Sequence, residues 1–445
     1  MQSDVLTIGE GIDRGGDPIQ ALLDGRYVDH ETGRAVSVET RSLVIADTLA
    51  GTEADLVGGL GFGRKLALVS DPTTYAVLGA RVEAAMRSRF DVQSIVLSDN
   101  PSPDDGTVAR IRAATASADA LIAIGSGTIN DLTKYTSALD GKPYAVFATA
   151  PSMNGYTSLT ASISQHGHKM TLPAQAPAGA FFDLAVLIEA PKRMIRAGLG
   201  DSICRATAQT DWLLSHLLLD TPYRQLPFDL LAAEEPLLLE IAGELVAGSL
   251  EAMRVLVRTL ILSGLGTAIV GSSAPASQAE HLVSHYIDML APTTRPNVLH
   301  GEQVGVTTLS IARLQETLLA SRPVVMPDTL TERDVLTRFG DELGRSVWPE
   351  FAAKRLDAAR AEQLNQRIAD RWSVISARLA TSVLSPARIE AVLLAAGAPT
   401  TPAAIYLDRS FYESALLHGR EIRNRFTVLD VLTANGRLPQ LLPTL

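Results

Sequence analysis

The feature that most constrains the fold is a regular alternation of short apolar segments and helical segments between Ser42 and Ala148. The apolar segments have the length and the β-branched content of buried strands. We predict strands at 66–69, 93–97, 120–124 and 144–148, and helices at 75–90, 105–116 and 129–139. This alternation indicates an α/β fold, in which a parallel sheet carries helices on both faces.

After Ala190-Pro191 the pattern becomes helical. Long helical segments are predicted at 201–219, 237–262, 279–289 and 303–319, with several more up to Leu432. A chain of 445 residues is too long for one ordinary core. We therefore expect a polar N-terminal extension at 1–40, an α/β domain at 41–195 and a mostly helical domain at 196–445.

Composition narrows the class of partner. The formal net charge of −10 argues against a nucleic-acid partner, which would require a basic surface. The single cysteine, Cys204, fits a reducing cytoplasm. The first residues are acidic and lack a long apolar run, so no signal peptide is expected. The most apolar stretch, 230–270, is interrupted by charged residues, so no membrane partner is expected either.

Three histidines lie in the short window from Glu280 to Val304. His281 and His285 are four residues apart and share one face of a helix, and His300 follows a turn. Two imidazoles and a carboxylate such as Asp201 would make a three-ligand site for a divalent metal, with a position left for a substrate oxygen. The alternative is that these histidines pack, cap a helix or pair with carboxylates.

A glycine-rich turn joins the strand at 120–124 to the next helix. It contains Gly125, Ser126, Gly127 and Thr128, and Asp131 follows one turn later. Glycines allow a ligand close to the backbone, Thr128 can cap the helix, and a helix N-terminus favours phosphate. The third glycine of the usual dinucleotide fingerprint is missing, so a strand-to-helix turn without a ligand is the alternative.

Two further loops follow predicted strands. Asp71 follows one strand and would accept hydrogen bonds from ribose hydroxyls, or else cap the next helix. The loop from Thr149 to Ser158 follows another strand and is rich in hydroxyls and backbone donors. From it we take Thr149, Ser152 and Ser158 as candidate nucleotide contacts.

Taken in order, these segments resemble the sn-glycerol-1-phosphate dehydrogenase family, within the superfamily of dehydroquinate synthases, glycerol dehydrogenases and iron-containing alcohol dehydrogenases. The order of the motifs is more specific than any one of them. The motifs are Asp71-Pro-Thr-Thr, Gly125-Ser-Gly-Thr-Ile-Asn-Asp, Thr149-Ala-Pro-Ser-Met-Asn-Gly-Tyr, Gly200-Asp201 with Asp211-Trp212, Glu280-His-Leu-Val-Ser-His and His300-Gly301.

The resemblance implies a Rossmann-like nucleotide-binding domain followed by a helical metal-binding domain, as in dehydroquinate synthase. It implies NAD or NADP as cofactor, and one divalent ion (Zn, Ni or Fe) held by Asp201, His281 and His300. His285 would contact the substrate or relay its proton. The family also suggests a homodimer.

Three positions depart from the family pattern. Asn154 stands where the family has an acid, at a position that we count as catalytic. Ala274 stands in Ser-Ala-Pro-Ala-Ser-Gln, where the family has an arginine that would suit a phosphate. Arg205 replaces a lysine. Loss of the arginine predicts weak use of glycerol-1-phosphate and a gain from Ala274→Arg.

The resulting hypothesis is a metal-dependent NAD(P)-linked dehydrogenase. Its substrate would be sn-glycerol-1-phosphate and dihydroxyacetone phosphate, or a related polyol or polyol phosphate. Two alternatives stay open: a dehydroquinate-synthase-like cyclase, which gives no net NADH, and a non-catalytic nucleotide- or metal-binding relative.

Overall fold

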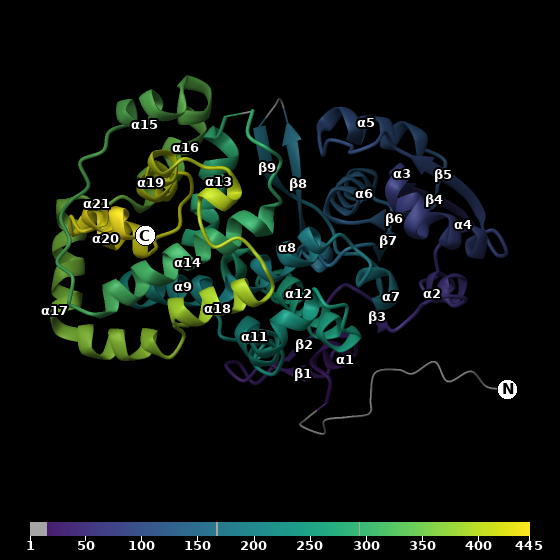
Figure 1. Ribbon diagram of the computed structural model, residues 1–445, viewed down its shortest axis with the longest axis horizontal. Helices are drawn as coiled ribbons and strands as arrows, with labels where there is room; N and C mark the ends of the chain where they lie inside the picture. The colour runs from purple at the N-terminus through teal and green to yellow at the C-terminus, as the bar shows by residue number, and fades with distance from the viewer. Residues whose placement is uncertain (1–15, 166–167, 293) are drawn as a thin grey trace. The chain divides into compact units, whose positions relative to one another are not determined.

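The computed structural model describes residues 16–165, 168–292 and 294–445, and the chain forms two compact units (Figure 1). The first unit contains the described part of Met1–Gly198 together with Gln225–Ser272. The second contains Leu199–Arg224 and Ser273–Leu445. The division does not follow a single cut in the chain, because the segment after Arg224 returns to the first unit.

The first unit is built on a six-stranded sheet in the order β3-β10-β7-β6-β4-β5, and every neighbouring pair is parallel. This confirms the predicted α/β class. The strands are β3 (Ser42–Ala46), β4 (Lys65–Ser70), β5 (Asp91–Val96), β6 (Ala120–Gly125), β7 (Tyr144–Ala148) and β10 (Gly179–Asp183).

Helices cover the sheet on both faces because its strands are apolar on both sides. Leu66 and Leu68 of β4 share a core cluster with Leu78 and Val82, which lie in η1 (Tyr75–Gly79) and α4 (Ala80–Met86). The alternate residue Ala67 is also fully buried. The other helices of this part are α2 (Glu53–Gly58), α3 (Pro72–Thr74), α5 (Asp105–Ala114), α6 (Gly127–Asp140) and α7 (Leu184–Leu187).

Strands β3 and β10, and the antiparallel hairpin of β8 (Thr160–Gln165) and β9 (His168–Pro173), were not among the predicted strands. The segment expected to be a polar extension contains α1 (Pro18–Leu23), β1 (Tyr27–Val28) and β2 (Ala35–Val36). It contributes the buried side chains Ile19 and Leu22. The N-cap residue Asp17 also forms an ion pair with Arg258, 3.0 Å away.

The first unit also contains α10 (Leu226–Asp229), α11 (Glu234–Leu245) and α12 (Leu250–Val270). One helix was expected at 237–262, but Gly248 has a positive φ of 83° and Ser249 caps α12 through the amide of Ala252. By length and composition, α12 is the one helix among the described residues that could cross a membrane. However, 67% of its most apolar window is buried, as in a core helix.

The second unit is helical, as predicted. It contains the end of α8 (Lys192–Ile203), α9 (Arg205–Leu219), α13 (Ala279–Leu290) and α14 (His300–Leu319). The helix expected at 201–219 is broken at Cys204. The later helices are α15 (Glu332–Phe339), α16 (Asp341–Lys354), α17 (Ala358–Ala380), α18 (Pro386–Ala395), α19 (Arg409–His418), α20 (Val428–Ala434) and α21 (Leu438–Leu441).

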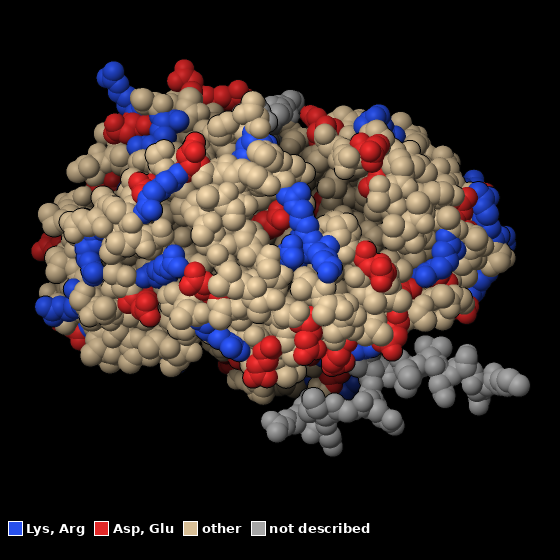
Figure 2. All heavy atoms as spheres, in the orientation of Figure 1, with Lys and Arg blue, Asp and Glu red and all other residues tan. Residues whose placement is uncertain are grey.

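The surface shown in Figure 2 carries basic and acidic side chains in mixture, separated by uncharged residues. This matches the composition, in which 49 acidic and 39 basic residues give only a moderate net charge.

Candidate metal site and nucleotide loops

Asp201, His281 and His300 converge in the second unit although they are far apart in the sequence. Asp201 lies near the end of α8, His281 in the first turn of α13, and His300 at the start of α14. One ligand atom from each lies within 4.8 Å of the other two. The Nε2 atom of His281 is 3.7 Å from Oδ1 of Asp201, and both side chains are buried. Donor atoms so arranged can hold one ion.

Glycines bring these segments close together. A Cβ atom on Gly200 would lie 2.0 Å from the carbonyl oxygen of Gly301, and one on Gly305 would lie 3.5 Å from Cα of Gly200. No side chain fits at the first of these positions, so α8 and α14 touch through their backbones. Because Asp201 follows Gly200 and His300 precedes Gly301, this contact places the two candidate ligands side by side.

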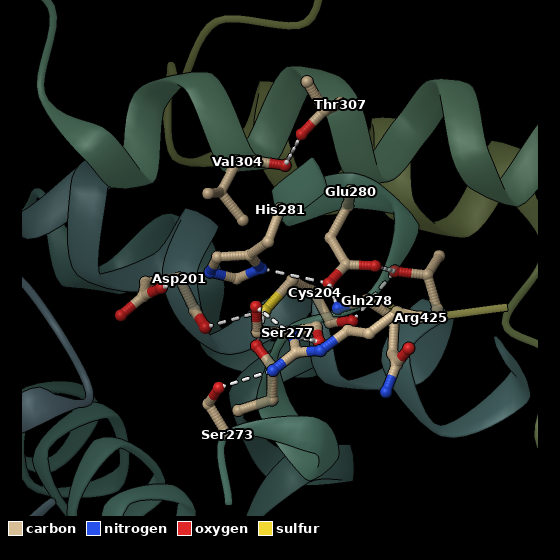
Figure 3. Close-up of polar contacts among 12 residues, drawn as sticks. Asp201, Cys204, Ser273, Ser277, Gln278, Glu280, His281, Val304, Thr307 and Arg425 are labelled. Atoms are coloured by element: carbon tan, nitrogen blue, oxygen red, sulfur yellow. Dashed lines mark hydrogen bonds and ion pairs between the residues drawn. The ribbon is translucent and has the colours of Figure 1, made fainter. Parts of the chain in front are cut away.

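His281 is oriented by its neighbour Glu280 (Figure 3). The Nδ1 atom of His281 is 3.0 Å from Oε1 of Glu280, while Nε2 is directed toward Asp201. Glu280 is fully buried and also accepts hydrogen bonds from Thr207 Oγ1 (3.0 Å) and from the amide of Gln278 (2.7 Å). A carboxylate that receives the Nδ1 proton leaves Nε2 free to bind a metal.

The hydrogen-bonded pair of His281 and Glu280 favours a protonated imidazole and an ionised carboxylate. Burial lowers the pKa of His281, but its hydrogen bonds to Asp201 and Glu280 outweigh burial and raise the pKa to about 8. Burial raises the pKa of Glu280, but the contacts with His281 and the nearby backbone amides outweigh it, so the net pKa is lowered. Asp201 and Glu280 thus stabilise a proton on His281, and a metal that binds at Nε2 would take the place of that proton.

His285 joins the same group. Its ring centroid lies 5.9 Å from that of His281 and 6.0 Å from that of His300, and it is stacked on His300 with an interplanar angle of 24°. The rings of His281 and His300 are 5.1 Å apart. The structure thus brings all three imidazoles of the sequence window together.

The donor set fits a divalent metal of the zinc, nickel or iron type, since one carboxylate and two imidazoles suit all three. A second group, Cys204 with Glu280 and His281, is equally compact. In that group burial, together with Glu280 and Asp201, raises the pKa of the Cys204 thiol well above its usual value. The thiol also donates to the carbonyl of Asp201 at 3.1 Å. A protonated thiol is a poor ligand, so the first group is the better candidate.

In the first unit, the predicted nucleotide residues gather at one edge of the sheet. Strands β4, β6 and β7 are neighbours, and Asp71, Gly125 and Thr149 lie at or just after their carboxyl ends. Dinucleotides bind at this edge of such sheets. The amide of Thr149 donates to the carbonyl of Gly125 at 3.2 Å, which joins two of these loops.

Two capping expectations are decided by the structure. Ser126, not Thr128, is the N-cap of α6, so the proposed capping role of Thr128 is wrong. The reason is that the extended conformation ends at Ser126 and the helix begins at Gly127. Asp71 caps α3, where its Oδ1 accepts from the amide of Thr74 at 2.8 Å. Helix capping was one of the two roles predicted for Asp71, and the other, contact with a ribose, stays a prediction.

Other predicted contacts have structural partners. Oδ2 of Asp131 accepts from the amide of Ser162 at 3.0 Å and so fixes the β8–β9 hairpin. Ser158 Oγ donates to the carbonyl of Gly155 at 3.0 Å. Asn154 is packed on α12, because a Cβ on Gly264 would lie 2.5 Å from its carbonyl oxygen. Ser152 lies in the same loop, between β7 and η2 (Gly155–Thr157).

Sequence reasoning missed Lys134, which is fully buried in α6. Its Nζ atom donates to the carbonyls of Gly155 (2.5 Å) and Thr160 (3.2 Å) and lies 3.2 Å from Ser158 Oγ. Burial lowers the pKa of Lys134 to about 8, against the opposing effect of Asp131. Lys134 therefore anchors the loop that carries Ser152 and Asn154. The neighbours of Lys134 on its helix face, Asn130, Asp131 and Ser137, are polar, so the sequence carried no signal of its burial.

Comparison with known proteins gives a consistent result. The model of the iron-containing alcohol dehydrogenase family matches residues 44–191. Glycerol-1-phosphate dehydrogenase [NAD(P)+] from Halalkalibacterium halodurans is 37% identical over 256 residues, which cover 56% of this chain and 64% of that protein. The enzyme of the same name from Geobacillus stearothermophilus is 31% identical over 349 residues, 77% of this chain and 75% of that protein.

A solved structure shares the fold. Sulfoacetaldehyde reductase from Bifidobacterium kashiwanohense, in complex with NAD+, superposes with a TM-score of 0.61 at 14% identity. The match covers 91% of this chain and 96% of that one.

Proposed function

Because this chain belongs to the glycerol-1-phosphate dehydrogenase family of iron-containing alcohol dehydrogenases, we propose that it interconverts sn-glycerol-1-phosphate and dihydroxyacetone phosphate. The chain is an NAD(P)-linked, metal-dependent oxidoreductase that acts on a CH–OH group. A related polyol or polyol phosphate is the alternative substrate. The observation that carries the proposal is the convergence of Asp201, His281 and His300 within 4.8 Å.

The residues have separable roles. Asp201, His281 and His300 would hold the metal, and Glu280 would keep His281 in the tautomer that presents Nε2. When bound, the metal polarises the C–O bond of the substrate as a Lewis acid, and the nicotinamide supplies or accepts the hydride. His285, stacked on His300, would carry the hydroxyl proton toward solvent.

The nucleotide would bind at the carboxyl edge of the sheet. The amides from Gly125 to Thr128 at the start of α6 would receive its pyrophosphate, because a helix N-terminus attracts anions. Thr149 and Ser152 would add contacts from the neighbouring loop, and Asp71 would meet the ribose. We further propose a cytoplasmic homodimer without a nucleic-acid or membrane partner.

Enzyme assays decide between this function and the two alternatives. The purified protein, loaded in turn with Zn, Ni or Fe, is given dihydroxyacetone phosphate with NADH or NADPH, and oxidation of the nucleotide is followed by absorbance. We expect steady-state oxidation that stops on addition of a chelator. A cyclase would show no net change in the nucleotide. Binding of metal and nucleotide without turnover of any polyol would instead indicate a non-catalytic relative.

A further inference from the structure

A half-buried arginine, Arg425, lies beside the loop in which Ala274 replaces the arginine of the family. Ala274 begins η3 (Ala274–Ala276), in the turn between α12 and α13. Arg425, which follows η5 (Gly419–Glu421), reaches this turn from the far end of the sequence (Figure 3). Its guanidinium donates to Ser273 Oγ at 2.6 Å and to Ser277 Oγ at 2.8 Å, and also to the carbonyl of Ser277. The two serines flank Ala274, so the guanidinium is held next to that position.

Arg425 makes no direct contact with a carboxylate among the described residues. All three hydrogen bonds go to neutral oxygens, and within the described part of the chain no carboxylate forms an ion pair with it. Arg423 adds a positive charge nearby, while the carboxylates of Glu280 and Glu350 act on Arg425 through their charge without a hydrogen bond to it. Burial, followed by Arg423, lowers the pKa of Arg425 to about 10, so the group stays protonated at neutral pH. A half-buried cation without a directly bonded carboxylate attracts an anion.

The cation also lies close to the candidate metal site. Ser277 is followed by Gln278, whose amide donates to Glu280, and Glu280 holds His281. The Cα atoms of Ser277 and His281 are therefore at most ~14 Å apart, since four residues span about 3.5 Å each when fully extended. The side chains and a three-carbon phosphate together can bridge such a distance.

We propose that Arg425 binds the phosphate group of the substrate and thereby replaces the arginine that is absent at Ala274. The inference rests on the proposed function, and it names the residue that selects phosphorylated over unphosphorylated substrates. An arginine offers planar, paired donors that match a phosphate, and the two serines hold this plane in place. Weak use of glycerol-1-phosphate is then no longer expected.

The test compares two substrates in matched variants. Arg425→Met should raise the KM for glycerol-1-phosphate 10- to 150-fold, equivalent to about 1.5–3 kcal/mol, and affect kcat/KM for glycerol by a much smaller factor. Arg345→Met, which removes an exposed arginine of the same unit, should change neither. Arg425→Lys keeps the charge and should raise the same KM by a smaller factor. It also serves as the decisive variant if the methionine variant does not fold.

A second pair of variants tests whether an arginine at position 274 can take over the role of Arg425. Ala274→Arg should lower the raised KM of the Arg425→Met enzyme, and should give little gain in the enzyme that keeps Arg425. Equal losses on both substrates, or an unchanged KM for glycerol-1-phosphate in a folded Arg425 variant, would overturn the inference.

Failure of the proposed function gives a different result. If the parent protein turns over neither substrate, calorimetric titration of glycerol-1-phosphate into the metal-loaded protein still tests Arg425. Binding by the parent that is lost in Arg425→Met supports the inference. Equal binding by the two proteins, or no binding to the parent, contradicts it.

Discussion

At the scale of single residues, the carboxylate of Glu280 is as informative as the ligands themselves. It shares the Nδ1 proton of His281 and is held by Thr207 and by the amide of Gln278. Residues that orient a metal-binding histidine in this way typically affect metal affinity 10- to 100-fold. Loss of this carboxylate should therefore be measurable without any change of ligand.

We predict that Glu280→Gln weakens metal binding about 10- to 100-fold, because the neutral amide no longer stabilises the Nδ1–H form of His281. Competition with a chromophoric chelator measures the affinity. Glu390→Gln, which removes an acid from α18 whose side chain is 42% exposed, is the matched control and should bind as the parent does. Equal affinities in the two variants would mean that Glu280 only fills space.

The sequence predicted which residues form the candidate metal site. It did not predict which other side chains hydrogen-bond to them or lie next to them. The spacing of His281 and His285 on a helix fixed their common face, and the family motif added Asp201 and His300. The role of Glu280 depends on its side-chain rotamer and could not be read from spacing. Arg425 lies 148 positions from Ser277 and could be connected with it only through the folded chain.

At the scale of elements, the N-terminus of α6 carries the nucleotide hypothesis. A Cβ on Gly127 would lie 3.1 Å from Sδ of Met153, so a larger side chain would displace the neighbouring loop and also occupy the ligand's place. We predict that Gly127→Val raises the dissociation constant of NAD(H) or NADP(H) at least about tenfold, equivalent to about 1.4 kcal/mol, and leaves the metal bound. Fluorescence titration measures it.

The control for that experiment is Gly106→Val, in the first turn of α5, where a Cβ would meet Asp104 at 3.5 Å. It introduces the same β-branched residue at a helix start that has no proposed ligand. If Gly127→Val folds and binds nucleotide as this control does, the pyrophosphate lies elsewhere.

A second element-scale prediction concerns the junction of α9 and α20. Asp211 of α9 is fully buried and accepts from the amide of Val428 at 3.0 Å. Burial, followed by the charge of Glu280, raises the pKa of Asp211 to about 8. Because its folded pKa exceeds its unfolded value of 3.8, its contribution to stability is complete below about pH 4 and is lost as the pH rises to about 8.

Asp211→Asn should remove this dependence, since an amide keeps the acceptor for Val428 and does not ionise. The free energy of unfolding of the variant should rise relative to the parent by up to about 1.4 kcal/mol per pH unit between pH 5.5 and 7.5. Denaturant titrations at the two pH values measure it. In the control Asp341→Asn, at an exposed residue, the free energy of unfolding should depend on pH as it does in the parent. Parallel behaviour of Asp211→Asn would show that Asp211 is ionised in the native state.

Regular elements were predictable where the periodicity was strong. Strands β4 to β7 and helices α5 and α6 match their predicted ranges closely. The interruptions at Cys204 and Gly248 were not predicted, because apolar side chains continue on both sides of each break. In β8 only Ala161 and Ile163 are buried apolar residues, and the hairpin of β8 and β9 depends on Asp131 of α6 for one of its hydrogen bonds. Such tertiary support leaves no local pattern.

At the scale of the whole molecule, the chain returns to its first unit after having entered the second. An amphipathic pattern predicts which face of α11 or α12 is buried, but not which partner buries it. For this reason the sequence predicted one boundary, between a domain at 41–195 and a domain at 196–445. The contacts in the folded chain instead assign α10, α11 and α12 to the unit that contains the six-stranded sheet. The candidate metal site lies wholly in the second unit, and the nucleotide loops lie wholly in the first.

The central claim is that Asp201, His281 and His300 hold one divalent metal, and metal content after exhaustive dialysis tests it most directly. We predict one ion per chain for the parent protein. His300→Ala should lose both the ion and the activity, because two ligands rarely retain a metal. His285→Ala, which removes the stacked histidine, should keep the ion and lose activity. Full metal content in His300→Ala would contradict the account.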